Sequence, residues 1–419
     1  MKKTYFYGLI SVFILLALSC KEKSSPIDLD EKYIEPVEVI SPKAAKVQVD
    51  NFAHFITIDF AKGTDISKVN IKLNLTEGIT MSDPKETTLT CDLTKEILLK
   101  VQKGASIIPF KVKSNLVVVS FNPSDKGWIK NETFGTLPGY LSVYKYTKTV
   151  DSKAVEAYIA VADINNGNAR FSVLGEKHYD KPTPTPTQFY ENNSQPKILL
   201  NGGYFWDGYS LGLLIRNSKT INIAQTMVWR NYNGVSTVYY PTNGVFGQNS
   251  DGTFSAHWAY SPDINTFYTY SAPSPNKMGE APQAFPSATF PSTGQSWTPK
   301  EAIGAGPVLI KEGKYKNLWE AEMLDAGSGI GPTVDNPRSA VGYNPNGYLV
   351  FFVCEGRNKT PNTPGLTLKN VADLLMEIGC TEALNLDGGG SSCMLINGKE
   401  TIKPSDGKQR SITNGIALY

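Results

Sequence analysis

The chain has 419 residues, of which 41% are hydrophobic and 19% charged, as in an ordinary globular protein of two or three domains. Its 41 Lys and Arg and 39 Asp and Glu leave a formal net charge of +2, which gives no electrostatic basis for nucleic-acid binding. The 36 glycines cluster in short motifs and favour turn-rich β structure over long helices.

The N-terminal segment is typical of an export signal. Two lysines precede the apolar stretch 9–18, which is too short to span a membrane comfortably. Because Ala17-Leu18-Ser19-Cys20 resembles a lipobox, we predict a lipoprotein signal peptide over residues 1–20, lipidation at Cys20 and a polar tether over 21–34. The alternative is a plain signal peptide with an incidental cysteine. We expect a protein of the cell envelope, periplasmic or surface-exposed, held by lipid to a bacterial membrane.

Residues 35–125 carry short runs of alternating apolar and polar side chains, such as 55–60 and 71–75. Turn residues separate these runs at the spacing of a small sandwich. We predict an immunoglobulin-like β-sandwich that resembles modules of bacterial surface lipoproteins. It is interpreted as a spacer, with carbohydrate binding as the alternative.

Residues 135–419 form the predicted catalytic domain. The segment 181–187 predicts a proline-rich loop, and residues 231–300 predict long loops and irregular strands that can rim a cleft. One helix is clear over 367–379, where Thr367 is a good N-cap and apolar residues recur at helical spacing. The predicted fold class is α+β, with mixed, mostly antiparallel sheets and few helices.

The most informative motif is Leu384–Ser392, in which an apolar strand delivers Asp387 into three glycines and two serines. Three successive glycines cost folding entropy, so they favour a backbone that curls around an anion or a sugar. A glycine hairpin is the alternative. The candidate binding residues here are Gly388, Gly389 and Ser391.

Four shorter motifs accompany other predicted strands. The pair Gly202 and Gly203 follows Asn201 after an apolar strand, where backbone N–H groups can approach a ligand or simply form a tight turn. Small residues at 304–306 can form a pocket wall or allow close packing. Pro337 stiffens the backbone before Arg338, which suits bidentate recognition of phosphate, although a surface salt bridge is the alternative.

The other two motifs pair charged or amide side chains with strand ends. Glu355 and Arg357 close the apolar strand 348–354, where either a cleft or a solvated turn can form. Arg410 and Asn414 precede the last predicted strand.

Taken in order, these motifs resemble the phosphodiester glycosidase family over roughly residues 140–419. The sequence departs from the family at two places: Glu355 stands where many members carry Asp, and Gln409 stands where many carry Glu. The resemblance implies an enzyme that hydrolyses the glycosidic C–O bond of a sugar-1-phosphodiester, such as an N-acetylglucosamine-1-phosphodiester. The products are free sugar and a phosphomonoester.

The chemistry implied by the resemblance assigns roles to the candidate residues. A phosphomonoester leaves readily because its second pKa is about 6, so the site must chiefly stabilise charge and provide a carboxylate. We expect Arg338 to clamp the phosphate, Asp387 to act as nucleophile or general base, and Glu355 to be the second carboxylate. The expected substrate-binding residues are Asn201, Gly202, Gly203, Arg357, Gly388, Gly389, Ser391, Arg410 and Asn414.

Three alternatives remain beside this hypothesis. One is a non-catalytic binding protein for anionic envelope or host glycans, and another is a phosphodiesterase that breaks the P–O bond. No cofactor is predicted, because the three histidines form no helical ligand pair. The third alternative is a divalent cation held by Asp325, Asp335 and Asp387. The sequence leaves the oligomeric state open.

Overall fold

The computed structural model describes residues 32–419 apart from residues 43, 62–63, 118–120, 317 and 325. The predicted signal peptide, Cys20 and most of the predicted tether lie outside the described residues. Among the residues that are described, no helix has the length and apolarity needed to cross a membrane. The chain forms two compact units, one from Ser67–Ser114 and the described part of Met1–Ile58, and the other from Asp59–Ile66 and Asn115–Tyr419.

The first unit contains a three-stranded and a five-stranded sheet. Buried and exposed side chains alternate along its longest strand, in which Ile108, Phe110 and Val112 are buried, as the period of two in the sequence predicts. The immunoglobulin-like topology itself stays a prediction. The three-stranded sheet has the order β1 (Glu38–Ser41), β4 (Val69–Lys72), β6 (Thr88–Cys91). The five-stranded sheet has the order β2 (Lys46–Asp50), β3 (Phe55–Ala61), β8 (Ser106–Val117), β7 (Ile97–Lys103), β5 (Ile79–Asp83).

The second unit is built mainly from an eight-, a six- and a five-stranded sheet. The eight-stranded order is β27 (Lys314–Tyr315), β26 (Val308–Lys311), β30 (Glu382–Asn385), β28 (Arg338–Asn344), β29 (Tyr348–Cys354), β13 (Ala157–Asp163), β10 (Leu141–Tyr146), β9 (Trp128–Lys130). The six-stranded order is β19 (Lys219–Asn222), β18 (Leu214–Arg216), β25 (Glu301–Ala305), β22 (Asn243–Gln248), β23 (Phe254–Tyr260), β24 (Tyr268–Tyr270). The five-stranded order is β14 (Phe171–Gly175), β33 (Asn414–Leu418), β15 (Ile198–Asn201), β31 (Met394–Ile396), β32 (Lys399–Glu400).

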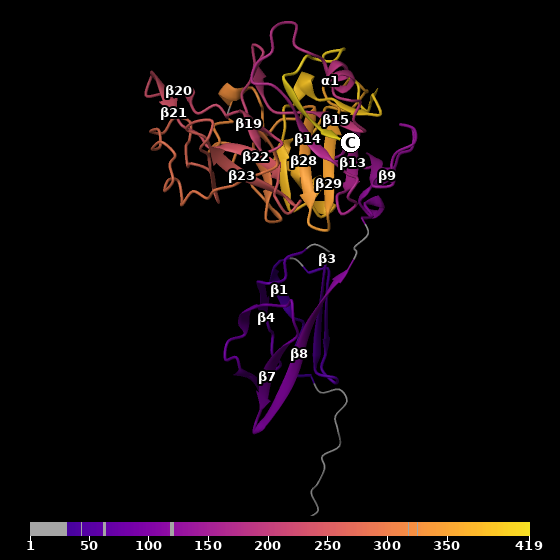
Figure 1. Cartoon of the computed structure of the whole chain (residues 1–419), viewed down its shortest axis with the longest axis vertical. Helices are drawn as coiled ribbons and strands as arrows, with labels where there is room; N and C mark the ends of the chain where they lie inside the picture. Colours follow the sequence, from indigo (N-terminus) through magenta and orange to yellow (C-terminus); the bar gives the residue numbers. More distant parts are fainter. Residues whose placement is uncertain (1–31, 43, 62–63, 118–120, 317, 325) are drawn as a thin grey trace, which may run out of the picture. The chain divides into compact units, whose positions relative to one another are not determined.

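Three two-stranded hairpins complete the β structure of this unit. They are β11 (Thr149–Val150) with β12 (Lys153–Ala154), β16 (Phe205–Trp206) with β17 (Tyr209–Ser210), and β20 (Val228–Tyr232) with β21 (Val235–Tyr239). Figure 1 shows β20 and β21 at one edge of the unit and β9 at the opposite edge in this view. The region 231–300, predicted as long loops and irregular strands, contains the strands β21 to β24, and the long segment 271–300 joins β24 to β25.

One hydrophobic core joins the three large sheets of the second unit. It includes Val341 of the eight-stranded sheet, Phe246 of the six-stranded sheet and Leu200 of the five-stranded sheet, all inaccessible to solvent. A second cluster packs Val371 and Leu375 of the helix α2 (Leu368–Glu377) against the eight-stranded sheet. Burial of these apolar faces fixes the strand ends from which the candidate site is built.

Two α-helices occur in the described ranges, and both begin with a capping box. The helix predicted over 367–379 is confirmed as α2, and Thr367 caps it. The other, α1 (Pro186–Asn192), begins inside the predicted proline-rich loop because Thr185 caps it and Pro186 occupies its first turn, where proline is tolerated. The second unit is therefore predominantly β, and the strand pairs of its sheets are antiparallel, not mixed.

Candidate active site

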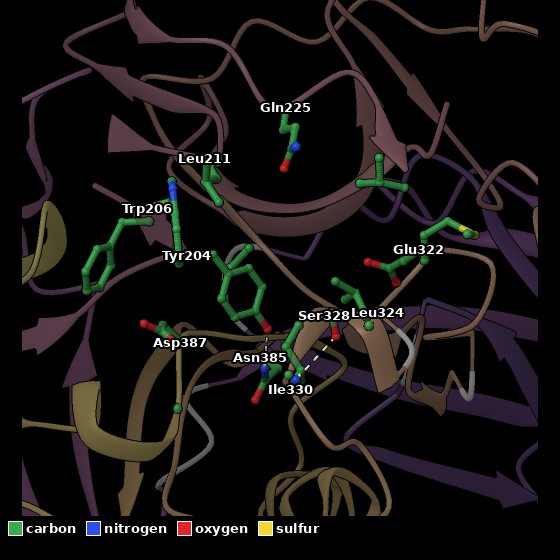
Figure 2. A pocket seen from close by; sticks show the side chains of 18 of the residues that line it. Tyr204, Trp206, Leu211, Gln225, Glu322, Leu324, Ser328, Ile330, Asn385 and Asp387 are labelled. Atoms are coloured by element: carbon green, nitrogen blue, oxygen red, sulfur yellow. Dashed lines mark hydrogen bonds between the residues drawn. The ribbon is translucent and has the colours of Figure 1, made fainter. Parts of the chain in front are cut away.

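A cleft of about 710 Å³ opens in the second unit. Its walls come from the hairpins β16–β17 and β20–β21, from residues 322–324 and 327–330, and from the end of β30 with the segment 387–389 that follows it. In the view of Figure 2, Tyr204 lies between Asp387 and Glu322 in this cleft. The cleft therefore combines three carboxyl groups, those of Asp207, Glu322 and Asp387, with polar and aromatic neighbours.

Asp387 lies in the cleft wall, as its motif predicted. Its backbone N–H donates to the carbonyl of Gly202 at 2.9 Å, and its own carbonyl accepts from the side-chain amide of Asn201 at 2.7 Å. Burial raises the pKa of its carboxyl to about 6, while hydrogen bonds from Ser391 and the charge of Arg410 act in the opposite direction. Near neutral pH this carboxyl is therefore mostly ionised but titrates readily.

Glu322 is a second carboxyl in the cleft, and the sequence analysis did not single it out. It is 4% exposed, and its Oε1 accepts from the indole N–H of Trp258 at 2.8 Å and from the N–H of Val308 at 3.0 Å. Burial raises the pKa of Glu322 to about 7. The hydrogen bonds from Trp258, Val308 and the backbone of Gly244 lower this pKa but offset only part of the effect of burial. A carboxyl with this pKa is present in both protonation states near neutral pH, as a general acid requires.

Tyr204 and Asn385 form a polar pair at the cleft. The Tyr204 hydroxyl donates to the carbonyl of Gly306, and Asn385 Nδ2 donates to that hydroxyl at 3.1 Å and to Gly306 at 2.8 Å. Burial and the charge of Asp387 raise the pKa of Tyr204, so the hydroxyl stays protonated. Asn385 Oδ1 is buried and has no hydrogen-bond partner in the described part of the chain, so this side chain acts at the cleft through its Nδ2 donors.

Arg338 is 2% exposed and lines the cleft, but its donors are directed to the backbone. It donates to the carbonyls of Leu366 and Ile330 at 3.0 Å each, and to Gly331 and Val334 at 2.6 and 2.7 Å. Four of its five N–H groups are thereby used. The predicted bidentate phosphate clamp is therefore corrected: Arg338 holds the wall of the cleft and contributes positive charge to it.

Arg357 and Arg410 also line the cleft, and both pair with Asp406. Their contacts to Asp406 measure 3.2 and 2.6 Å, so two guanidinium groups share one carboxylate and leave a net charge of +1. A Cβ at Gly389 would lie 2.8 Å from Arg357, and one at Gly390 would lie 2.1 Å from Arg410. The glycine run thus lets both guanidinium groups approach the backbone next to the candidate carboxylate.

Two amides of the glycine–serine run bind backbone carbonyls of the chain, so the predicted contact of these amides with a ligand anion is not supported. Gly389 donates to the carbonyl of Pro337 at 2.9 Å, and Ser391 donates to Gly388 at 3.1 Å. The Gly388 N–H bonds to the Asp387 carboxyl and lowers its pKa. The glycines are required for close approach, since Gly389 also has a φ of 59° in the left-handed region.

Glu355 is buried and is not among the residues that line the cleft. One carboxylate oxygen accepts from the N–H of Thr360, and the other accepts from the N–H of Lys403 at 3.0 Å. The side chain therefore fixes two loops, and this placement does not support its predicted role as the second carboxylate of the reaction. Glu322 stands in the cleft instead.

The predicted sugar-binding residues around Asn201 form a buried cluster behind the cleft wall. The N–H of Gly202 donates to the backbone carbonyl of Asn414 at 3.1 Å, and the N–H of Gly203 donates to Oδ1 of Asn414 at 2.6 Å. Asn414 Nδ2 in turn donates to the hydroxyl of Ser210 at 3.2 Å. A Cβ at Gly203 would lie 2.1 Å from the carbonyl of Gly304. These residues position the backbone of Asp387 and are absent from the cleft lining, so their predicted contact with substrate is not supported.

In the residues that the structure covers, no group of three or more His, Cys, Asp and Glu is arranged to hold a metal ion. Asp335, one of the three residues in the metal hypothesis, forms an ion pair of 2.7 Å with Lys153. Asp325 lies outside the described residues. The four cysteines of the described ranges are buried and free.

The comparisons with known proteins identify a family. The family model of phosphodiester glycosidases matches residues 194–419, more than half of the chain. The chain belongs to the phosphodiester glycosidase family. The matched region contains the cleft, both candidate carboxyl groups and the three arginines.

Individual relatives match over shorter stretches. The chain is 34% identical over 119 residues to the SPbeta prophage-derived uncharacterized protein YomE of Bacillus subtilis, covering 28% of this chain and 17% of that one. It is 36% identical over 104 residues to the human N-acetylglucosamine-1-phosphodiester alpha-N-acetylglucosaminidase, covering 25% of this chain and 19% of that one. The matched part thus spans less than a fifth of either relative.

Among solved structures, the catalytic domain of the zebrafish N-acetylglucosamine-1-phosphodiester alpha-N-acetylglucosaminidase, auto-inhibited by its pro-peptide, is similar to this chain with a TM-score of 0.44. It is 19% identical in sequence, and the alignment covers 68% of this chain and 85% of that one.

Proposed function

We propose that this protein hydrolyses the glycosidic C–O bond of a sugar-1-phosphodiester. The observation that supports this most directly is the presence of Asp387, Glu322 and Arg410 in one cleft. The family supplies the reaction class, and the cleft supplies an ionised carboxylate, a carboxyl that titrates near neutrality and a positive charge for phosphate.

The two carboxyl groups suit opposite roles. Asp387, with a pKa of about 6, is ionised at neutral pH and acts on the anomeric carbon as nucleophile or as base for the attacking water. Glu322, with a pKa of about 7, keeps a proton that it can donate to the departing phosphate oxygen. The C–O bond breaks, the hydroxyl of water ends on the sugar, and the phosphate leaves as a monoester.

The departing phosphate needs less help from an acid than an alcohol would. Its second pKa is about 6, so charge stabilisation contributes most. Arg357 and Arg410, which share Asp406, are placed to bind its oxygens, and Arg338 adds its charge from the cleft wall.

The decisive experiment measures release of free sugar from an α-N-acetylglucosaminyl phosphodiester by the purified protein. We expect Asp387→Asn to lower kcat by about a thousandfold or more while thermal unfolding is unchanged. Asp373→Asn is the control, because Asp373 pairs with Lys369 on the exposed side of α2. Wild-type activity in Asp387→Asn would remove Asp387 from the chemistry.

The same assay separates the proposal from its alternatives. In ¹⁸O-labelled water, cleavage of the C–O bond places the label in the sugar, whereas cleavage of the P–O bond places it in the phosphate. A wild-type protein that releases no sugar from a panel of sugar phosphodiesters, yet binds glycans on an array, would be a binding protein.

We also propose that lipidation at Cys20 holds the enzyme at a bacterial membrane. Two lysines, a short apolar stretch and the lipobox-like 17–20 support this. Metabolic labelling with a fatty acid tests it: label is expected on the wild type and absent from Cys20→Ser. Unlabelled wild-type protein that fractionates without membranes would contradict it.

A further inference from the structure

The hydroxyl of Ser391 lies between a cation and a carboxyl group of the candidate site. It hydrogen-bonds to the carboxyl of Asp387, and Arg410 Nη1 donates to its oxygen over 3.5 Å. The Ser391 side chain is 1% exposed and is not among the residues that line the cleft, so its predicted contact with substrate is not supported. Ser391 instead contacts two residues that do line the cleft.

The chemistry of the three groups fixes the direction of both hydrogen bonds. A guanidinium group has donors but no acceptor, so the single proton of the Ser391 hydroxyl cannot be donated to Arg410. An ionised carboxylate only accepts, and the hydroxyl therefore donates to Asp387. A donor of this kind stabilises the ionised carboxylate over the protonated one, and Ser391 has the largest of the effects that oppose the burial of Asp387.

A single turn at the end of the glycine run holds the hydroxyl in this place. Gly389–Ser391 form a 3₁₀ turn, in which the N–H of Ser391 donates to the carbonyl of Gly388 at 3.1 Å. Gly390 in this turn contacts Arg410, because a Cβ there would lie 2.1 Å from the guanidinium group. The glycines thus bring the hydroxyl, the guanidinium group and the carboxyl together.

The next serine of the motif is equally buried but lacks these contacts. Ser392 is 2% exposed, and its hydroxyl has no hydrogen-bond partner among the residues that the structure describes. Two adjacent serines therefore differ in whether their hydroxyl reaches the candidate carboxylate. Ser392 provides a matched control for Ser391.

We propose that Ser391 is a positioning residue that keeps Asp387 ionised for its reaction while Arg410 holds the serine hydroxyl in place. This inference rests on the function proposed above and adds a third member to the pair of Asp387 and Arg410. The group that binds phosphate and the carboxylate that acts on the anomeric carbon are then connected through one hydroxyl.

The other charged and titratable side chains of the cleft leave this effect visible in a pH profile. They are Tyr204, Asp207, Glu322, Arg338, Arg357 and Arg410. Arginine keeps its charge between pH 5 and 8, and Tyr204 keeps its proton because burial and the charge of Asp387 raise its pKa. The hydrogen bond from Lys181 lowers the pKa of Asp207, which is therefore ionised throughout. Glu322 titrates in the same range as Asp387, but it belongs to the descending limb of the profile.

The test measures kcat/KM for an α-N-acetylglucosaminyl phosphodiester from pH 5 to 8. In Ser391→Ala the pKa of Asp387 should rise by about one unit, because the ionised carboxylate loses a donor. We therefore expect a loss of about tenfold at pH 5 and of less than about twofold at pH 8. Ser392→Ala should match the wild type at every pH.

A second variant covers the case in which Ser391→Ala does not fold, as thermal unfolding would show. Ser391→Cys keeps nearly the same shape, and its thiol is a weaker donor, so the ascending limb should again move to higher pH. An equal loss at both pH values, or no loss, would overturn the proposal, because a purely structural role does not depend on the ionisation of Asp387. The same shift in Ser392→Ala would also overturn it.

A measurement without substrate separates this proposal from the proposed function. If the wild type cleaves no sugar phosphodiester, the proposed function fails, and an NMR titration of ¹³C-labelled aspartate carboxyl groups replaces the rates. Asp387→Asn identifies the signal of Asp387. A titration midpoint about one pH unit higher in Ser391→Ala would then still support the role of Ser391, whereas an unchanged midpoint would overturn it.

Discussion

The side-chain amide of Asn201, at the end of β15, donates a 2.7 Å hydrogen bond to the backbone carbonyl of Asp387, which follows β30 in another sheet. Asn201 Oδ1 also accepts from the hydroxyl of Ser339 at 2.6 Å and from the N–H of Cys393 at 3.1 Å. One buried amide thus connects the five-stranded sheet, the eight-stranded sheet and the segment that carries the candidate nucleophile or base.

Asn201→Ala should therefore weaken both stability and activity. The substitution leaves buried groups of Ser339 and Cys393 without their partner, so we expect the free energy of unfolding to fall by about 2 kcal/mol. The carbonyl of Asp387 also loses its fixed position, so kcat should fall more than KM rises. Chemical denaturation and steady-state kinetics measure the two effects. Wild-type kcat in the folded variant would show that this bond does not position Asp387.

The pH dependence of kcat/KM should be a narrow bell. Activity rises with pH through about 6 as Asp387 ionises, and falls through about 7 as Glu322 loses its proton. Glu322→Gln should lower the maximum and abolish the descending limb, because a glutamine cannot donate the proton as an acid. Exposed Glu320→Gln is the matched control. A descending limb that persists in Glu322→Gln would assign it to another group.

The raised pKa of Glu322 also predicts how the free energy of unfolding changes with pH. Because burial raises its pKa in the folded state, the folded protein holds this proton more tightly than the unfolded chain does. Its contribution to stability is therefore complete below the unfolded pKa of about 4.3 and is lost as the pH rises to about 7. Glu322→Gln should flatten this decline in denaturation measured from pH 4 to 8, and a decline as steep as that of the wild type would contradict the assignment.

Arg410→Ala should weaken phosphate recognition. A lost charge-assisted contact to a phosphate oxygen is expected to raise KM by about ten- to hundredfold and to weaken inhibition by inorganic phosphate in parallel. Arg410 also lowers the pKa of Asp387, so the ascending limb of the pH profile should move to higher pH. Arg216→Ala removes a surface pair with Glu176 and serves as control. An unchanged phosphate inhibition constant would exclude Arg410 from the anion site.

Gly390→Ala should disturb the same anion site through its backbone. The added Cβ would lie 2.0 Å from Asp406 Oδ2 and 2.1 Å from Arg410, so the pair must move apart. We expect a rise in KM similar to that of Arg410→Ala, measured with the same substrate. Gly139→Ala is the control, because its Cβ would meet no atom within 4 Å. Unaltered kinetics in Gly390→Ala would show that the arginine position is not critical.

Local sequence signals predicted part of this site. A strand that runs into three glycines and two serines identified Asp387, and Arg357 and Arg410 were found in motifs at strand ends. Glu322 was missed because an isolated glutamate carries no motif, and its partner Trp258 lies 64 residues away. Such a carboxyl becomes visible only when the fold buries it.

The two predicted roles that the observed contacts do not support, those of Arg338 and Glu355, have a related cause. The sequence places Arg338 and Glu355 at strand ends, but it does not say which backbone groups their side chains meet. The carbonyls bound by Arg338 come from residues 330–334 and from Leu366, and the amides bound by Glu355 belong to Thr360 and Lys403. In the fold, α2 was predictable from its apolar stripe, whereas α1 is too short to show one.

The antiparallel pairing of β26 and β30 connects the segments that carry the two candidate carboxyl groups. Val308 of β26, whose N–H binds Glu322, stands opposite Leu384 of β30, three residues before Asp387. Adjacent strands lie about 4.8 Å apart, so this pairing links the backbone that binds Glu322 directly to the strand that leads into Asp387. The hairpin β20–β21 is connected to the same region, because Arg230 donates to the carbonyl of Met323, the residue after Glu322. A change in the strand pairing or in this hairpin should therefore reach the candidate acid.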